Sequence, residues 1–233
     1  MRRFATAWLL ALAALFVSSA SASTLGGVAS RRLFSDELPA RPVTLLASFT
    51  VQNNTPITTG TALDYGGTWT VHAGSWSVAS GQAQCGSNPA CNVLSTISVD
   101  AGRRYGSASV ALDVSNGLAT RSGGVVLDRS AAGDFLVALY RNVLPGGEVA
   151  LLKVVGGVST TLATASTTGR PTAASLRVTR SGATVTVELN GTTYVTHSLS
   201  AGDQAVFGAN ATRWGIALDS DRNTRVDDFL MVG

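Results

Sequence analysis

Short runs of alternating apolar and polar residues, separated by turn-forming residues, constrain the fold of this 233-residue chain more than any other feature. Residues 134–140 read DFLVALY and residues 183–189 read ATVTVEL. A period of two with many β-branched side chains is typical of β-strands. The dipeptide Ser181-Gly182 separates two such runs, as in a tight hairpin. The sequence therefore predicts an all-β fold of antiparallel strands from Thr44 onward.

These strands are numerous enough to form one domain. About 190 residues of antiparallel strands can bury a substantial core, and a two-sheet sandwich is the expected way to do so. A short helical turn is expected near 201–207. In the run 134–140, alternation places Phe135 on one face and Tyr140 on the other. If the Phe135 face is the core, Tyr140 faces outward.

The N-terminus indicates a secreted protein. Arg2 and Arg3 precede a largely apolar run at 4–17, and a small-residue A-x-A site follows at 20–22. This pattern predicts a signal peptide over 1–22. Two prolines favour an irregular segment over 23–43, followed by a single domain over 44–233. The expected location is extracellular, secreted or at the cell surface, with no membrane span after signal cleavage.

The two cysteines support that location. Cys85 and Cys91 lie in the stretch QCGSNPACN, which contains turn formers between them. In an oxidising compartment such a pair is expected to form a disulfide that closes a hairpin loop.

The charge balance argues against a nucleic-acid partner. The chain has 17 basic and 14 acidic residues, and removing Arg2 and Arg3 leaves 17 − 2 = 15 basic residues. No basic stripe is visible, whereas nucleic-acid binding needs one.

Five segments in order resemble the concanavalin A-like lectin/glucanase superfamily, in particular the laminin G-like jelly rolls of secreted bacterial proteins. They are GTWTVHAGSWSVASGQAQ (67–84), GGVVLDRSAAGDFLVALY (123–140), ALLKVVGGVSTTLA (150–163), SLRVTRSGATVTVELNGT (175–192) and RVDDFLMV (225–232). The resemblance implies a two-sheet antiparallel jelly-roll sandwich whose first and last strands, 45–52 and 227–232, pair. It also implies a calcium ion that holds the fold together in many members.

An acidic cluster near the C-terminus is the candidate metal site. It is not an EF-hand loop, because Thr224 and Leu230 stand where that loop needs Gly and Glu. Ser48 precedes Phe49 where related domains often carry Asp, which removes one expected ligand. A solvated acidic turn paired with arginines is the alternative. The candidate ligands of a structural Ca²⁺ are Asp219, Asp221, Asp227 and Asp228.

Catalytic motifs are not found in the sequence. Glucanases of the resembled superfamily carry an E-x-D-x-E-like strand, and this chain has none. Asp113 and Asp128 could face each other across a sheet as a carboxylate pair, or be polar outward positions of two strands. We therefore expect no catalytic residues.

A binding role is the leading interpretation. Sugar-binding proteins stack aromatic rings on the sugar and hydrogen-bond its hydroxyl groups. Trp69, Trp76 and Trp214 are expected in the core. The sequence predicts a non-catalytic, lectin-like module for a polysaccharide or cell-surface glycan. The alternatives are a structural or adhesive cell-surface module and, less favoured, a glycoside hydrolase. The candidate ligand-binding residues are Tyr140, Arg121, Arg129 and Asp134.

Overall fold

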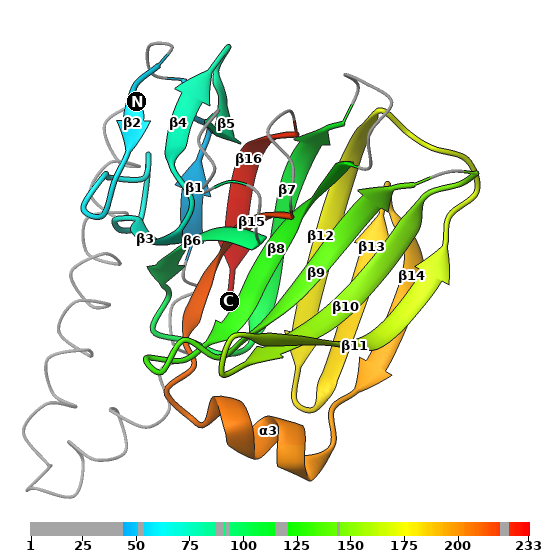
Figure 1. Ribbon diagram of the computed structural model, residues 1–233. Helices are drawn as coiled ribbons and strands as arrows, with labels where there is room; N and C mark the ends of the chain where they lie inside the picture. Colours follow the sequence, from blue (N-terminus) through cyan, green and yellow to red (C-terminus); the bar gives the residue numbers. More distant parts are fainter. Residues whose placement is uncertain are drawn as a thin grey trace, which may run out of the picture. The chain divides into compact units, whose positions relative to one another are not determined.

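The described part of the chain forms two antiparallel sheets in the computed structural model, as predicted (Figure 1). The structure describes residues 44–50, 54–86, 91, 94–114, 121–143, 145–219 and 224–233. The predicted signal peptide and the segment 23–43 lie outside these residues. Within them, no helix has the length and apolar composition to cross a membrane.

The larger sheet has the strand order β14-β13-β12-β7-β16-β5-β4-β2, and β1 also pairs with β16. Each hairpin follows the alternating runs and turn residues of the sequence. Its strands are β1 (Thr44–Ala47), β2 (Pro56–Ile57), β4 (Trp76–Ala79), β5 (Gln82–Cys85), β7 (Gly106–Asp113), β12 (Ala173–Ser181), β13 (Thr184–Leu189), β14 (Thr192–Ser198) and β16 (Arg225–Val232).

The smaller sheet has the strand order β11-β10-β9-β8-β15-β6-β3. One short helix, α3 (Ala201–Phe207), occupies the predicted position; Ser200 caps it by accepting a hydrogen bond from Asp203 N. The strands are β3 (Thr70–Ala73), β6 (Leu94–Asp100), β8 (Arg121–Arg129), β9 (Phe135–Asn142), β10 (Glu148–Val155), β11 (Val158–Ser166) and β15 (Arg213–Asp219).

The main core lies between the two sheets, and the three predicted tryptophans Trp69, Trp76 and Trp214 are buried in it. Tyr140 is also fully buried there, and its hydroxyl donates to Pro171 O at 3.2 Å. The expectation that Tyr140 faces outward is therefore wrong. Strand β9 does alternate as predicted, but both of its faces are apolar, and the Tyr140 face is the one that meets the other sheet.

The opposite face of the seven-stranded sheet, which we call the outer face, carries a second apolar cluster. Its members are buried although they point away from the main core. Alternation along each strand explains this, because neighbours of core residues must face the other way. The cluster consists of Val126, Phe135, Val137, Leu139, Ala150, Leu152, Val154 and Ala217.

The first and last strands pair, as the resemblance implied. Thr44 to Ala47 run antiparallel to Phe229 to Val232. The first strand ends at Ala47 and is shorter than the predicted 45–52. The ring of Trp69 packs between those of Phe49 and Phe229, with centroid distances of 6.1 and 5.3 Å. The chain ends are thus joined by backbone pairing and by an aromatic cluster.

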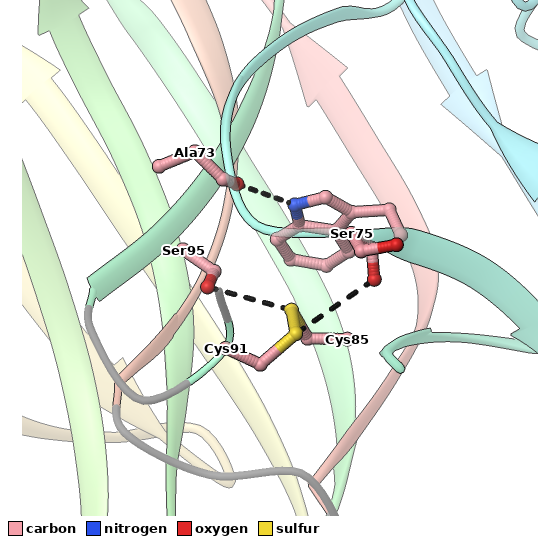
Figure 2. Close-up of a disulfide and its surroundings, with 6 residues drawn as sticks. Ala73, Ser75, Cys85, Cys91 and Ser95 are labelled. Carbon is pink, nitrogen blue, oxygen red and sulfur yellow. Dashed lines mark hydrogen bonds between the residues drawn. A yellow bond between two sulfur atoms is a disulfide. The ribbon is translucent and has the colours of Figure 1, made fainter. Parts of the chain in front are cut away.

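The predicted disulfide between Cys85 and Cys91 is present (Figure 2). Both sulfur atoms are buried: Cys85 Sγ lies 3.4 Å from Ser95 Oγ, and Cys91 Sγ lies 3.8 Å from Ser75 O. Gly74 makes room for this packing. Its φ is +90°, and a Cβ there would lie 2.7 Å from the Ser95 side chain.

A β-bulge near the end of β8 changes the directions of the side chains of Asp128 and Arg129. Asp128 has a φ of +50°, and the pairing of β8 with β15 shifts register beside it. The bulge turns Asp128 into the interior. Its Oδ2 accepts from Arg104 Nε at 3.2 Å and from Arg180 Nε at 3.1 Å. The next residue, Arg129, lies opposite Arg213 and takes part in the site described below.

Candidate functional site

A polar pocket of about 330 Å³ opens where β6 and β8 end and β15 begins. It adjoins the apolar cluster of the outer face through Arg129, whose guanidinium lies over the Phe135 ring. Its size falls at the lower end of the range for small-molecule sites. The lining residues are His72, Asp100, Arg129, Ser130, Ala131, Gly133, Asn210, Thr212 and Arg213.

Arg129 forms the floor of this pocket and is only 8% exposed. Its guanidinium lies over the Phe135 ring at 4.5 Å, and Nη1 donates to Thr96 Oγ1 at 3.3 Å. Its Nε is buried and has no hydrogen-bond partner among the described residues. Burial, with Arg213 nearby, lowers the pKa of Arg129 to about 10, so the group is charged at neutral pH. A buried donor without a partner is costly, and sites that bind ligands often hold such groups.

Arg213 and His72 form the next part of the lining. Arg213 Nη2 donates to Thr70 Oγ1 at 2.7 Å, and His72 Nε2 lies 2.7 Å from Ser98 Oγ. Partial burial, followed by the charges of Arg129 and Arg213, lowers the pKa of His72 to about 4. His72 is therefore neutral at pH 7 and can both donate and accept a hydrogen bond.

Asp100 is the one carboxylate among the described lining residues. It accepts hydrogen bonds from Thr212 Oγ1 at 2.7 Å and from Gly102 N at 2.9 Å. The bond from Thr212, followed by that from Gly102, lowers the pKa of Asp100. An acid held in its ionised form anchors the loop well and donates protons poorly.

The four sequence-predicted ligand-binding residues do not gather at one place. Arg129 lines the pocket, whereas Tyr140 is in the core between the sheets. Asp134 lies beside the pocket but accepts a hydrogen bond from Gly156 N at 2.8 Å, tying the start of β9 to the β10–β11 turn. The backbone of Arg121 pairs with Asn142 at the start of β8, the strand that ends at Arg129.

The described acidic candidates for calcium point in different directions. Asp219 ends β15 and pairs with Arg141 at 3.6 Å. Asp227 lines a groove on the nine-stranded sheet, and burial, with Asp228 beside it, raises its pKa. Asp221 lies outside the described residues. The described residues contain no group of three metal-ligating side chains of the His, Cys, Asp or Glu type. Structural calcium remains a prediction.

The two carboxylates considered as a catalytic pair lie in different sheets. Asp113 ends β7 in the nine-stranded sheet, and Asp128 lies near the end of β8 in the seven-stranded sheet. They therefore do not face each other across one sheet. Burial raises the pKa of Asp128, while the charges of Arg104 and Arg180 act in the opposite direction.

Sequence reasoning missed His72, Arg213 and Asp100 as partners of Arg129. These residues are separated by up to 141 positions, and only the pairing of β3, β6, β15 and β8 brings them together. The sequence contains one local signal: Thr70 and His72 are two residues apart and so share one face of a strand, and Arg213 precedes an apolar run. That signal is common among surface positions and does not identify a site.

No protein-family model matches this chain, and no curated protein matches it. Among solved structures, the GH43 protein BlXynB from Bacillus licheniformis aligns over 80% of this chain and 38% of its own, with a TM-score of 0.53 and 15% identity. An apo Crh5 transglycosylase aligns over 84% and 88%, with a TM-score of 0.51 and 16% identity. The carbohydrate-binding module CBM66 from Bacillus subtilis aligns over 70% and 91%, with a TM-score of 0.49 and 14% identity.

At these identities the likeness concerns the fold. The chain has the concanavalin A-like two-sheet sandwich that the sequence predicted. Proteins of many different functions share one fold, so the function depends on the side chains of the site.

Proposed function

We propose that this protein is a secreted, non-catalytic carbohydrate-binding module that binds a glycan in the pocket around Arg129. The unpaired, buried Nε of Arg129 carries this proposal. A sugar has oxygen atoms that can accept a hydrogen bond from such a donor. A new hydrogen bond stabilises a buried donor that lacks a partner more than it stabilises a donor that is already bonded to water.

Other features of the pocket support a glycan ligand. His72 in its neutral form and the Ser130 hydroxyl can each donate or accept, which suits the mixed character of sugar hydroxyl groups. The likeness to a transglycosylase and to a GH43 protein adds fold-level support. The buried disulfide fits an oxidising compartment outside the cell.

The hydrogen-bonded state of Asp100 favours binding over hydrolysis. Glycoside hydrolysis uses an acid whose pKa is raised, together with a second carboxylate. The pKa of Asp100 is instead lowered, because hydrogen bonds from Thr212 and Gly102 stabilise its charged form. We therefore assign Asp100 a role in holding the pocket wall.

One observation favours the second candidate, an adhesive or structural cell-surface module. Leu46, Leu230 and Val232 are 37%, 37% and 42% exposed on the adjacent strands β1 and β16. Neighbouring exposed apolar side chains are typical of contact surfaces between proteins. Self-association that the Leu230→Ser substitution weakens, without any glycan binding, would favour this candidate.

The test is a retention assay of the purified protein on a panel of insoluble polysaccharides and cell-wall preparations. We expect at least one polymer to retain the protein and its soluble oligosaccharide to release it. Arg213→Gln should weaken retention roughly tenfold or more, because it removes a charged donor from the pocket.

Arg177→Gln is the matched control. Arg177 lies on the nine-stranded sheet with a 58% exposed side chain, so the same change of charge is made away from the pocket. Retention should be unchanged. Absence of retention on every polymer, or equal retention of the Arg213 and Arg177 variants, would overturn the proposed function.

A further inference from the structure

The pocket holds two arginine side chains that form no ion pair with the described residues. Arg129 and Arg213 donate to the neutral hydroxyl groups of Thr96 and Thr70. Among the described residues, no carboxylate lies within ion-pair distance of either guanidinium group. Two guanidinium groups against the Asp100 carboxylate leave 2 − 1 = 1 positive charge in the pocket lining. Asp134, outside the lining, offsets part of the field at Arg129, and its carboxylate accepts a hydrogen bond from Gly156 N.

Burial and, after it, the charges of the two arginines keep His72 neutral, so this residue adds no positive charge to the lining. His72 stands beside the two arginines, and their field disfavours its protonated form. Arg129 is only 8% exposed, and its Nε has no partner among the described residues. This is unusual, because buried charged groups are normally paired. The lining is therefore arranged for a ligand that brings negative charge.

The geometry of Arg129 favours a carboxylate. Its Nη1 donates to Thr96, whereas its Nε has no acceptor in the described part of the chain. A planar carboxylate can accept two parallel hydrogen bonds from one edge of a guanidinium group, and such charge-assisted pairs are the stronger hydrogen bonds of proteins.

We propose, building on the carbohydrate-binding function, that the pocket recognises the carboxylate of an acidic sugar residue, with Arg129 as the primary contact and Arg213 as the second. Arg129 is positioned for this by the bulge at Asp128 and by its stacking on Phe135. A neutral His72 then contacts a ring hydroxyl group without competing for the anion.

The experiment compares polymers that differ in charge alone. Polygalacturonate, alginate and hyaluronan are each presented to the purified protein beside their methyl-esterified forms, with dextran and dextran sulfate as further arms. We expect at least one free acid to bind roughly tenfold or more tightly than its ester. Arg129→Gln should abolish this difference, and Arg177→Gln should preserve it.

The outcomes separate the two proposals. Equal affinity for acid and ester, with loss of both in Arg213→Gln, overturns the carboxylate assignment and leaves carbohydrate binding standing. Binding of neutral dextran, or of dextran sulfate with none of the uronates, also overturns the carboxylate assignment. No binding in any arm, nor on the polysaccharide panel described above, overturns both.

A second readout does not depend on affinity or on the folding of a variant. The His72 ring can be titrated by NMR in the free protein and with saturating uronate oligosaccharide. A carboxylate between the two guanidinium groups offsets the charges that help hold the pKa of His72 near 4. Burial, the largest cause of the low pKa, persists in the complex, so we expect the pKa to rise above 4 without reaching 6.5. The methyl ester buries the ring to a similar extent without bringing the charge, so an equal His72 pKa in the acid and ester complexes would show that the anion binds elsewhere.

Discussion

At the scale of single residues, Asp128 links the interior of the sandwich to the pocket. Its left-handed backbone turns its carboxylate towards Arg104 and Arg180 and leaves Arg129 on the outer face. Arg180 is fully buried, and its Nη1 also donates to Gly182 O. In the described part of the chain, Asp128 Oδ1 and Arg180 Nη2 have no hydrogen-bond partner. The cluster is thus held mainly by the charge of one carboxylate.

We predict that Asp128→Asn lowers the free energy of unfolding by about 3–5 kcal/mol, because the buried charge of Arg180 loses its counter-ion. The amide has nearly the shape of the carboxylate, so the loss reports charge and not volume. Urea unfolding followed by tryptophan fluorescence measures it.

Asp228→Asn provides the matched control, with both variants measured in a calcium chelator because Asp228 is also a candidate calcium ligand. Asp228 is exposed and also has a positive φ, +49°, which Asn tolerates as well as Asp. The change should stay within about 0.5 kcal/mol. Equal effects of the two substitutions would mean that the buried ion cluster does not stabilise the fold.

At the scale of elements, local patterns in the sequence predicted most of the sandwich. The β12–β13 hairpin forms around Ser181-Gly182, and the buried face of β13 matches the predicted alternation. The prediction was wrong for β9, because a strand that is apolar on both faces does not show which face meets the other sheet.

The pocket was not predictable in the same way. It depends on the register between β8 and β15, which places Arg129 opposite Arg213, and on the bulge that precedes Arg129. A bulge changes the face of every following side chain, and nothing in the sequence DRSAAGD marks where it occurs. Of the four predicted ligand-binding residues, the structure therefore retains Arg129 in the pocket lining.

We predict that the disulfide makes a modest contribution to the stability of the fold. Cys85 and Cys91 close a loop of six residues' separation, and so short a loop removes about 2 kcal/mol of unfolded-state entropy. The double substitution Cys85→Ala with Cys91→Ala should lower the free energy of unfolding by about that amount, plus a packing loss, because both side chains are buried.

Equilibrium unfolding in urea measures this loss, and the wild-type protein kept in a reducing agent serves as the comparison. If reduced wild type is as stable as the oxidised protein, the bond contributes nothing and packing alone holds this loop. Cys85 lies in the nine-stranded sheet, Arg129 lies in the seven-stranded sheet, and neither cysteine lines the pocket, so glycan retention should persist in the double variant.

At the scale of the whole molecule, the C-terminal strand organises the larger sheet. β16 pairs with β1, β5 and β7, so it joins the start, the middle and the end of the sequence. Phe229 and Met231 on this strand are fully buried, and Phe229 contacts Trp69. These pairings are distant in sequence and cannot form until the chain is nearly complete.

This arrangement predicts opposite results for two truncations. Pro42–Gly233 form one compact unit, so removal of residues 1–41 should leave the cooperative unfolding transition of that unit unchanged. Removal of residues 225–233 is a much smaller deletion, but it leaves β1, β5 and β7 without their shared partner and exposes the Trp69 cluster. We expect this variant to lose cooperative unfolding altogether, because the lost burial exceeds the marginal stability of a domain. Circular dichroism with thermal unfolding distinguishes the two, and a cooperative transition in the C-terminal truncation would show that the sheets assemble without β16.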